Sequence, residues 1–235
     1  MNINNQNSVV LLGFYGSDQI IAQSAWTSTS RDLTPDKIER IPKLINMLWS
    51  QGHETPFEKA SVHFLVNCDI ASHIHLLKHR IASINAESAR YKELKEDKFY
   101  LPEDWNLVAK NSKAIDKLQL DYVKLAYLPT WADVLEGYVK LGNELYHQAL
   151  NEISEYAGRK RAKESARFFK TYNSQIQADV QFNMRSFANF QKLRNSEHSQ
   201  IEIKLIAQQM LELVKGIEGN PFEHTLKVWE ETKVI

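Results

Sequence analysis

Residues Gln175–Met184, QIQADVQFNM, alternate strictly between polar and apolar side chains. A period of two is typical of a β-strand that buries one face and exposes the other, which here is rich in amides. Two further segments have strand character, since Val9–Phe14 is a short apolar run and Lys59–Asn67 alternates in part. These segments predict the strands of a small, mostly antiparallel sheet.

Helical patterns surround these strands. Thr34-Pro35 supplies a hydroxyl cap followed by proline at the first helical position, and apolar residues then share one face until the helix ends near Gly52. Further helices are expected over Asp18–Thr27, Asp69–Arg80, Asp104–Tyr156 with an interruption near Leu128–Pro129, Lys160–Thr171, Phe187–Leu193, Glu197–Gly216 and Pro221–Lys233. Ile81–Tyr91 is expected to be a loop or a broken helix. The fold class is therefore α+β, a small mostly antiparallel sheet flanked by helices.

The chain is long enough for one domain with a real core. It has 235 residues, of which 43% are hydrophobic, and no repeat or convincing linker interrupts it. We therefore predict a single domain over residues 1–235. Residues 1–7 are expected to be a disordered tail, and residues 104–160 a largely helical region.

Composition and charge exclude several classes of function. The formal net charge is +0, which argues against general nucleic-acid binding. No stretch approaches the roughly 18–20 apolar residues of a membrane span, and Met1–Asn7 has no basic-then-apolar signal pattern. The one cysteine, Cys68, excludes an internal disulfide and fits a reducing compartment. A cytoplasmic protein that binds neither nucleic acid nor membrane is expected.

Positive charge is concentrated in Lys78–Tyr91, KHRIASINAESARY. This stretch combines cationic groups with hydroxyls, an amide and one carboxylate. Guanidinium groups bind phosphate oxygens in a bidentate fashion, and hydroxyls and backbone N–H groups can satisfy the remaining acceptors. The segment indicates a site for a phosphorylated ligand, although the spacing alone also fits a solvated helix end.

Histidines and the cysteine offer two other kinds of chemistry. His75 and His79 lie four residues apart and would share a helix face, as metal-binding pairs do, with His73 on the same helix. No third ligand stands in a suitable frame, so we predict no metal site and expect these histidines to touch a ligand or the backbone. Cys68 precedes a helix start and could be a nucleophile, but a small buried residue is the favoured interpretation.

A second polar cluster follows the best strand. Arg185, Asn189 and Arg194 lie along the expected helix, with Arg185 and Asn189 four residues apart. The cluster is either the wet side of an amphipathic helix or a clamp for an anionic ligand.

Three blocks in order resemble flavin-dependent thymidylate synthases. Lys78-His79-Arg80, then seven residues, then Ser88, resembles the Arg-His-Arg…Ser hallmark of that family. Upstream, Gly52–Glu58 resembles its Gly-His-x-Ser/Thr-x-x-Glu segment. Downstream, Asn183–Arg194 and Gln200–Ile203 resemble its C-terminal block. The resemblance extends from about residue 20 to 215.

The resemblance implies an α+β homotetramer with FAD shared between subunits. The FAD ligands that it implies are Thr55 from a neighbouring subunit, Lys78, His79, Arg80, Asn183, Arg185, Asn189 and His198. The dUMP ligands that it implies are His75, Lys78, Glu87, Ser88, Ala89, Arg90, Arg167 and Arg194, with Arg167 placed by its spacing before Asn183. His53 would line a folate-side channel.

The implied activity is reductive methylation of dUMP to dTMP without a cysteine nucleophile. By resemblance, 5,10-methylenetetrahydrofolate supplies the carbon and NADPH reduces FAD. Negative charge develops on the uracil ring when a hydride reaches it, and a guanidinium aimed at the N3/O2 edge stabilises that charge. Arg194 is the expected catalytic residue, because arginine stays charged and presents a planar fork.

The sequence also departs from the family pattern. Lys78 replaces the first arginine of the hallmark, His75 stands where glutamine is frequent, and Ala86 stands where Glu or Gln is common, with Glu87 beside it. These departures motivate two alternatives. One is a related flavoenzyme that acts on an altered pyrimidine nucleotide, and the other is a non-catalytic nucleotide-binding protein.

Overall fold

The computed structural model describes residues 6–110, 112–118, 120 and 128–235. The chain divides into two compact units, which are described separately. Unit 1 comprises Met1–Asn7, Cys68–His73 and Ala86–Ile176, and unit 2 comprises Ser8–Asn67, Ile74–Asn85 and Gln177–Ile235. The single domain predicted from the sequence stays a prediction.

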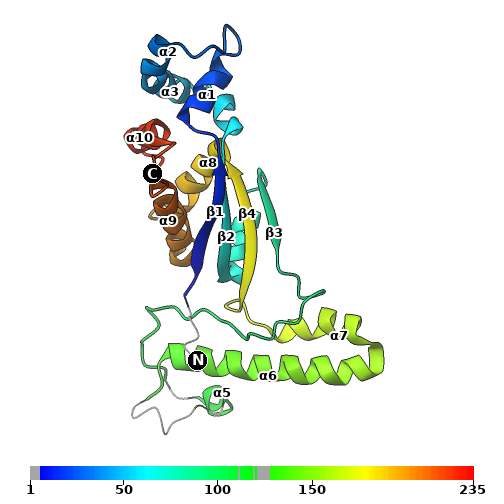
Figure 1. The fold of residues 1–235 in the computed structure, drawn as a ribbon. Coiled ribbons are helices and arrows are strands. Elements are labelled where there is room, and N and C mark those ends of the chain that lie inside the picture. Colours follow the sequence, from blue (N-terminus) through cyan, green and yellow to red (C-terminus); the bar gives the residue numbers. More distant parts are fainter. Residues whose placement is uncertain (1–5, 111, 119, 121–127) are drawn as a thin grey trace. The chain divides into compact units, whose positions relative to one another are not determined.

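Unit 2 is built on a four-stranded antiparallel sheet (Figure 1). The strand order is β1-β2-β4-β3, with β1 at Ser8–Tyr15, β2 at Ser61–Asp69, β4 at Gln175–Asn183 and β3 at Ala82–Ala86. β1 pairs antiparallel with β2 from Ser8↔Asn67 to Tyr15↔Ser61, and the register shifts between Leu11 and Gly13. The sequence prediction of an α+β fold with a small antiparallel sheet is confirmed.

The alternation that defines β4 has the predicted consequence. Ala178, Val180 and Phe182 are fully buried, whereas the intervening Gln177, Asp179 and Gln181 are exposed. The apolar side of β4 packs under α8, where Phe182 lies 5.1 Å, centroid to centroid, from Phe190. The sheet therefore holds α8 through its apolar side.

The helices of unit 2 cover the sheet and extend beyond it. α9 packs against both β1 and α8, and α10 packs against α3 (Figure 1). The bounds are α1 Asp18–Trp26, α2 Pro35–Glu39, α3 Ile41–Ser50, η1 Thr55–Lys59, α8 Met184–Arg194, α9 Ile201–Lys215 and α10 Glu223–Glu231.

The single helix expected from Thr34 to Gly52 is two helices. α2 ends at Glu39 and α3 begins at Ile41, with Arg40 between them. Pro42 explains the break, because its ring has no N–H and collides with the carbonyl four residues earlier in a continuous helix. The apolar face of α3 is nevertheless as predicted, since Ile41, Ile45 and Leu48 are buried.

The expectation of a loop or broken helix over Ile81–Tyr91 is wrong for its first half. α4 (Ile70–Leu77) ends before Arg80, and the chain then forms β3 (Ala82–Ala86) beside β4. Small side chains at Ala82 and Ala86 gave too weak an alternation to indicate a strand. Pairing with the neighbouring strand β4 stabilises β3, although the strand propensity of its residues is weak.

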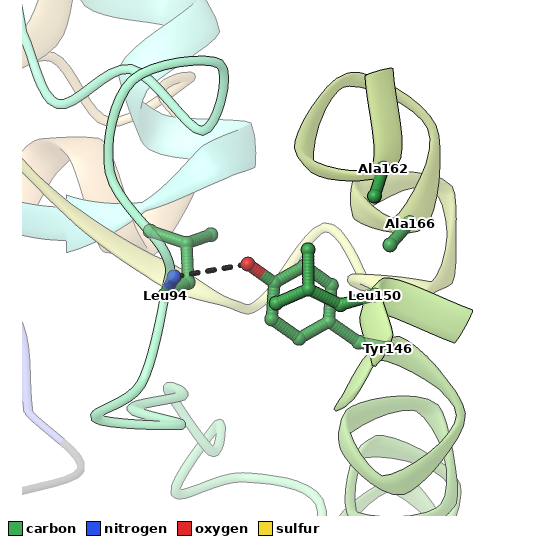
Figure 2. Close-up of a cluster of buried hydrophobic side chains, with 5 residues drawn as sticks. All are labelled: Leu94, Tyr146, Leu150, Ala162 and Ala166. Carbon is green, nitrogen blue, oxygen red and sulfur yellow. Dashed lines mark hydrogen bonds between the residues drawn. The ribbon is translucent and has the colours of Figure 1, made fainter. Parts of the chain in front are cut away.

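Unit 1 is organised around a helical pair. α6 (Trp131–Ala157) begins with a capping box in which Thr130 and Asp133 bond reciprocally, and it ends at Gly158, whose φ of +82° suits glycine. α7 (Arg159–Ala166) and η2 (Arg167–Phe169) follow. Tyr146 of α6 lies in an apolar cluster and accepts a hydrogen bond from the N–H of Leu94 at 3.1 Å (Figure 2).

Residues 104–160 are less helical than expected. Residues 104–110 contain turns and an isolated bridge, and α5 (Lys113–Asp116) is a single short turn. The expected helix over residues 111, 119 and 121–127 lies outside the described residues. Much of the expected disordered tail, residues 1–5, does so too, but Asn7 is buried and its amide donates to Asp69 Oδ2 at 2.7 Å. None of the described helices is long and apolar enough to cross a bilayer.

Candidate active site

Two histidines of unit 2 lie at the C-terminal end of α4 and just beyond it. Asp69 caps the helix, because its Oδ1 accepts a hydrogen bond from the N–H of Ser72 at 2.8 Å. His75 lies in the last turn, and His79 follows the helix end, where its N–H bonds to the carbonyl of Leu76. The two side chains are near enough for the charge of His75 to lower the pKa of His79.

His79 is bonded to Arg194. Its Nε2 accepts a hydrogen bond from Arg194 Nε at 3.0 Å, and its ring meets Phe190 edge-on at 5.0 Å. The side chain of His79 is only 8% exposed. Burial, reinforced by the charges of Arg194 and His75, lowers the pKa of His79 to about 4, so the ring is neutral near pH 7.

His75 has a partner from the start of α9. Its Nε2 lies 3.2 Å from Oε1 of Gln200, the residue that caps α9. The histidine that departs from the family pattern is therefore fixed from a second helix.

Lys78 and Arg80 differ from the histidine between them. Both are exposed, and among the described residues neither side chain takes part in a hydrogen bond or ion pair. Two cations without partners beside a neutral buried ring leave positive charge available to an anionic ligand.

The start of α8 contributes a third group. Asn183 caps the helix, its Oδ1 accepting from the N–H of Ser186 at 2.8 Å. Arg185 is bound from two sides, because Nε donates to Glu54 Oε2 at 2.8 Å and Nη1 donates to Glu58 Oε1 at 2.7 Å. These hydrogen bonds raise the pKa of the guanidinium further. Arg185 thus links α8 to η1, the short helix that carries Thr55.

The other expected ligands in unit 2 lie on the surface. His53, Thr55, Asn189 and His198 are all exposed, and within the described part of the chain none of their side chains has a hydrogen-bond partner. They are accessible to a ligand.

Unit 1 holds the expected nucleotide loop. The carbonyl of Ser88 accepts from the N–H groups of Tyr91 and Lys92, and its Oγ accepts from the N–H of Arg90, which closes a tight turn. Glu87 is paired with Lys92 at 2.6 Å, and Arg90 Nε with Glu164 at 3.1 Å. Both pairs are solvent-accessible, so a phosphate could replace the carboxylate on either cation.

Two more expected residues of unit 1 have different settings. Ala89 packs against the cluster that contains Tyr146, so it shapes the turn through its small side chain. Arg167 begins η2 and is exposed. No bond joins Arg167 to the Ser88 turn in the described residues.

Cys68 and His73 are both buried, and burial changes the pKa of each side chain. Cys68 is buried, as predicted, and burial together with the charge of Asp69 raises the pKa of its thiol. Among the described residues, no three His, Cys, Asp or Glu side chains converge as a metal ion would require. His73 is also buried, and burial lowers its pKa.

Sequence reasoning missed three sets of partners. Glu54 and Glu58 bind Arg185, Gln200 bonds to His75, and Phe190 packs on His79. The spacing of Glu54 and Glu58 on either side of Thr55 was a usable signal. The role of Gln200 had none, because its partner is 125 residues away in sequence.

Comparison with known proteins decides the family. A family model described as Thy1, thymidylate synthase complementing protein, matches residues 10–218. The chain belongs to the flavin-dependent thymidylate synthase family. The resemblance expected over about residues 20 to 215 is confirmed.

Relatives of this family match over most of the chain. The flavin-dependent thymidylate synthase of Pseudothermotoga lettingae is 32% identical over 89% of this chain and 85% of its own length. That of Thermosipho africanus is 32% identical over 92% and 90%. The crystal structure of the UMP/dUMP methylase PolB from Streptomyces cacaoi, bound with 5-Br dUMP, superposes with a TM-score of 0.71 at 24% identity, covering 98% of this chain and 97% of that one. This last likeness shows a shared fold.

Proposed function

We propose that this protein is a flavin-dependent thymidylate synthase that methylates dUMP to dTMP. In this proposal 5,10-methylenetetrahydrofolate is the carbon donor, NADPH is the reductant and FAD is the cofactor. The proposal rests on the geometry of Arg194. Its Nε donates a hydrogen bond to His79 Nε2, while Nη1 and Nη2 have no partner among the described residues. Those two nitrogens form the planar fork that a uracil N3/O2 edge requires.

The residues present fit an FAD. Lys78 and Arg80 are exposed cations without partners among the described residues, and Thr55, Asn189 and His198 are exposed donors. This set suits the diphosphate and sugar hydroxyls of a dinucleotide. When bound, FAD supplies a reduced ring that can give a hydride.

Arg185 would add a third cation to this set. Its guanidinium is held by Glu54 and Glu58, and it would be shared between these carboxylates and the cofactor. The pair of carboxylates fixes the direction of the side chain before a ligand arrives.

Two expected FAD ligands are less accessible. His79 is buried and its Nε2 is occupied by Arg194, so we leave it out of the set that holds the cofactor. Asn183 has its carbonyl oxygen occupied as a helix cap, which leaves its amide nitrogen for a ligand.

The protein's own contribution to the reaction is electrostatic and positional. Arg194 would stabilise the charge that develops on the uracil edge. In unit 1, Arg90 and Arg167 would bind a phosphate, and Ser88 would present its hydroxyl beside Arg90. His53 would line the approach of the folate.

No thiolate is required in this scheme. Cys68 is buried and the pKa of its thiol is raised, so the one cysteine of the chain is poorly suited to attack a substrate. We further infer a homotetramer, in which Thr55 serves a neighbouring subunit's FAD. The cytoplasmic location stays a prediction.

The experiment is an assay of the purified protein for flavin and for dTMP. We expect bound flavin by its visible absorption, and dTMP by chromatography only when dUMP, methylenetetrahydrofolate and NADPH are all present. Light scattering should give the mass of a tetramer. A colourless protein that also fails to bind added FAD would contradict the proposal.

A second candidate function is methylation of an altered pyrimidine nucleotide. It is favoured by His75, which departs from the glutamine frequent at this position and is fixed by its bond to Gln200. Mass analysis of the products from a mixture of pyrimidine nucleotides separates the two candidates. A product other than dTMP as the major species would favour the second.

A further inference from the structure

Arg194 ends α8 with a single tether. Its side chain is long and has several rotamers, so holding it in one geometry costs rotamer entropy. The hydrogen bond from Nε to His79 Nε2, at 3.0 Å, is its one bond to the described residues. A bond at Nε fixes the plane of the guanidinium and leaves the Nη1/Nη2 edge for a ligand.

His79 can accept this bond in one protonation state. Nε2 must lack a proton, so the ring is the neutral tautomer with the proton on Nδ1. Burial of the ring and the neighbouring charge of Arg194 both disfavour the imidazolium form.

α8 itself holds the ring of His79 in place. Phe190 meets the ring edge-on at 5.0 Å, and Phe190 and Arg194 are four residues apart on the same helix. Residues at this spacing share a helix face. One face of α8 therefore supplies both the wall against which His79 packs and the guanidinium that it accepts from.

His79 also differs from its neighbours in the motif. Lys78 and Arg80 are exposed and have no partner among the described residues, whereas His79 is buried against α8. The motif therefore consists of two exposed cations on either side of one buried hydrogen-bond acceptor.

We propose that His79 is a positioning residue, which holds the guanidinium of Arg194 in the plane that meets the pyrimidine edge. The assignment rests on the proposed function, since it concerns how Arg194 meets dUMP. It gives the central residue of the hallmark a role separate from cofactor binding.

Two substitutions distinguish a role of His79 as a hydrogen-bond acceptor from a role in which its ring only fills space. His79→Phe keeps an aromatic ring against Phe190 but removes the acceptor, whereas His79→Gln places an amide oxygen near the position of Nε2. We expect His79→Phe to keep the fold and the flavin absorption while kcat/KM for dUMP falls by about 10²-fold, the scale of a misplaced catalytic group. His79→Gln should restore most of that loss. His224→Gln on α10 is the matched control for a His-to-Gln change.

Other outcomes overturn the assignment. Loss of flavin rather than of dUMP turnover in His79→Phe makes His79 a cofactor ligand. Equal loss in both variants, with fold and flavin intact, removes the acceptor role. If His79→Phe does not fold, the comparison of His79→Gln with wild type tests the assignment. A 10²-fold loss of kcat/KM for dUMP in His79→Gln then contradicts the positioning role.

A spectroscopic measurement tests the bond without turnover. ¹⁵N NMR of the histidine rings in the full chain should show His79 with an unprotonated Nε2 near pH 7, assigned by its absence in His79→Gln. A protonated Nε2 refutes the bond. Wild-type protein that makes no dTMP refutes the proposed function instead, and the protonation state of Nε2 then decides the bond between His79 and Arg194 by itself.

Discussion

Nε of Arg185, at the start of α8, lies 2.8 Å from Oε2 of Glu54, just ahead of η1. A second bond from the same guanidinium to Glu58 makes Arg185 a bridge between two segments that are 127 residues apart. The two segments carry Thr55 and Asn189, which are both proposed to touch FAD. The side chain of Arg185 is 49% exposed, so its ion pairs position the two segments more than they stabilise the fold.

Arg185→Ala should therefore lower FAD occupancy with little loss of stability. Exposed ion pairs contribute about 0–1 kcal/mol, so the free energy of unfolding should fall by no more than about 1 kcal/mol. Flavin absorbance per protein and a urea melt measure the two effects. Lys192→Ala, an exposed lysine on the same helix, is the control. Full flavin content in Arg185→Ala would contradict the prediction.

Stability should fall at acid pH through His79. The pKa of His79 is about 4 in the folded chain against an ordinary 6.5, because the ring is buried beside Arg194 and His75. Between these values the unfolded chain binds the extra proton, so stability is present above about pH 6.5 and is lost as the pH falls towards 4.

Thermal unfolding of wild type and His79→Gln across that range measures this effect. The wild type should lose more stability on acidification than the variant does. Comparing the two removes the contributions of His73, whose pKa is also lowered, and Asp18, whose pKa burial raises. Identical pH profiles would show that His79 is not the group responsible.

Cys68→Ala should retain dTMP synthesis. The thiol is buried and its pKa is raised, so little thiolate exists near neutral pH. Removing one sulfur from the core should cost about 1 kcal/mol of stability, with turnover close to wild type. An assay of dTMP formation by folded protein checks this, and loss of turnover with the fold intact would restore Cys68 as a nucleophile.

Asp97→Asn should destabilise unit 1. Nζ of Lys170, on a side chain only 4% exposed, donates to Asp97 Oδ1 at 2.6 Å and to Asn143 Oδ1 at 2.7 Å. Asparagine tolerates the positive φ of +49° at this position, so the change removes the charge without adding backbone strain. We expect a loss of about 3 kcal/mol, because the buried ammonium loses its counter-ion.

Denaturant melts of single and double variants measure the coupling between the two residues. Asp97→Asn combined with Lys170→Met should be less destabilised than the sum of the single changes. His147 is a second partner of Asp97, with Nε2 2.8 Å from Oδ2. His147→Gln, which keeps the Lys170–Asp97 pair, should cost less stability than Asp97→Asn. Strict additivity would contradict the pair's role.

The sequence by itself determined the elements with strong periodicity and the family. β4 alternates in polarity and forms as predicted, and the apolar face of α3 is buried as predicted, because both patterns act over a few residues. Motif order is also readable in one dimension, so the three blocks indicated the family.

Only the tertiary structure decided which side chains meet. β3 formed because a neighbouring strand paired with it, and α2 and α3 separated at a proline in an otherwise continuous pattern. The contact of His79 with Arg194 joins residues 115 positions apart, and that of His75 with Gln200 joins residues 125 apart. Such contacts depend on how helices pack on the sheet, which local sequence does not encode. The burial that makes His79 neutral arises from the same packing.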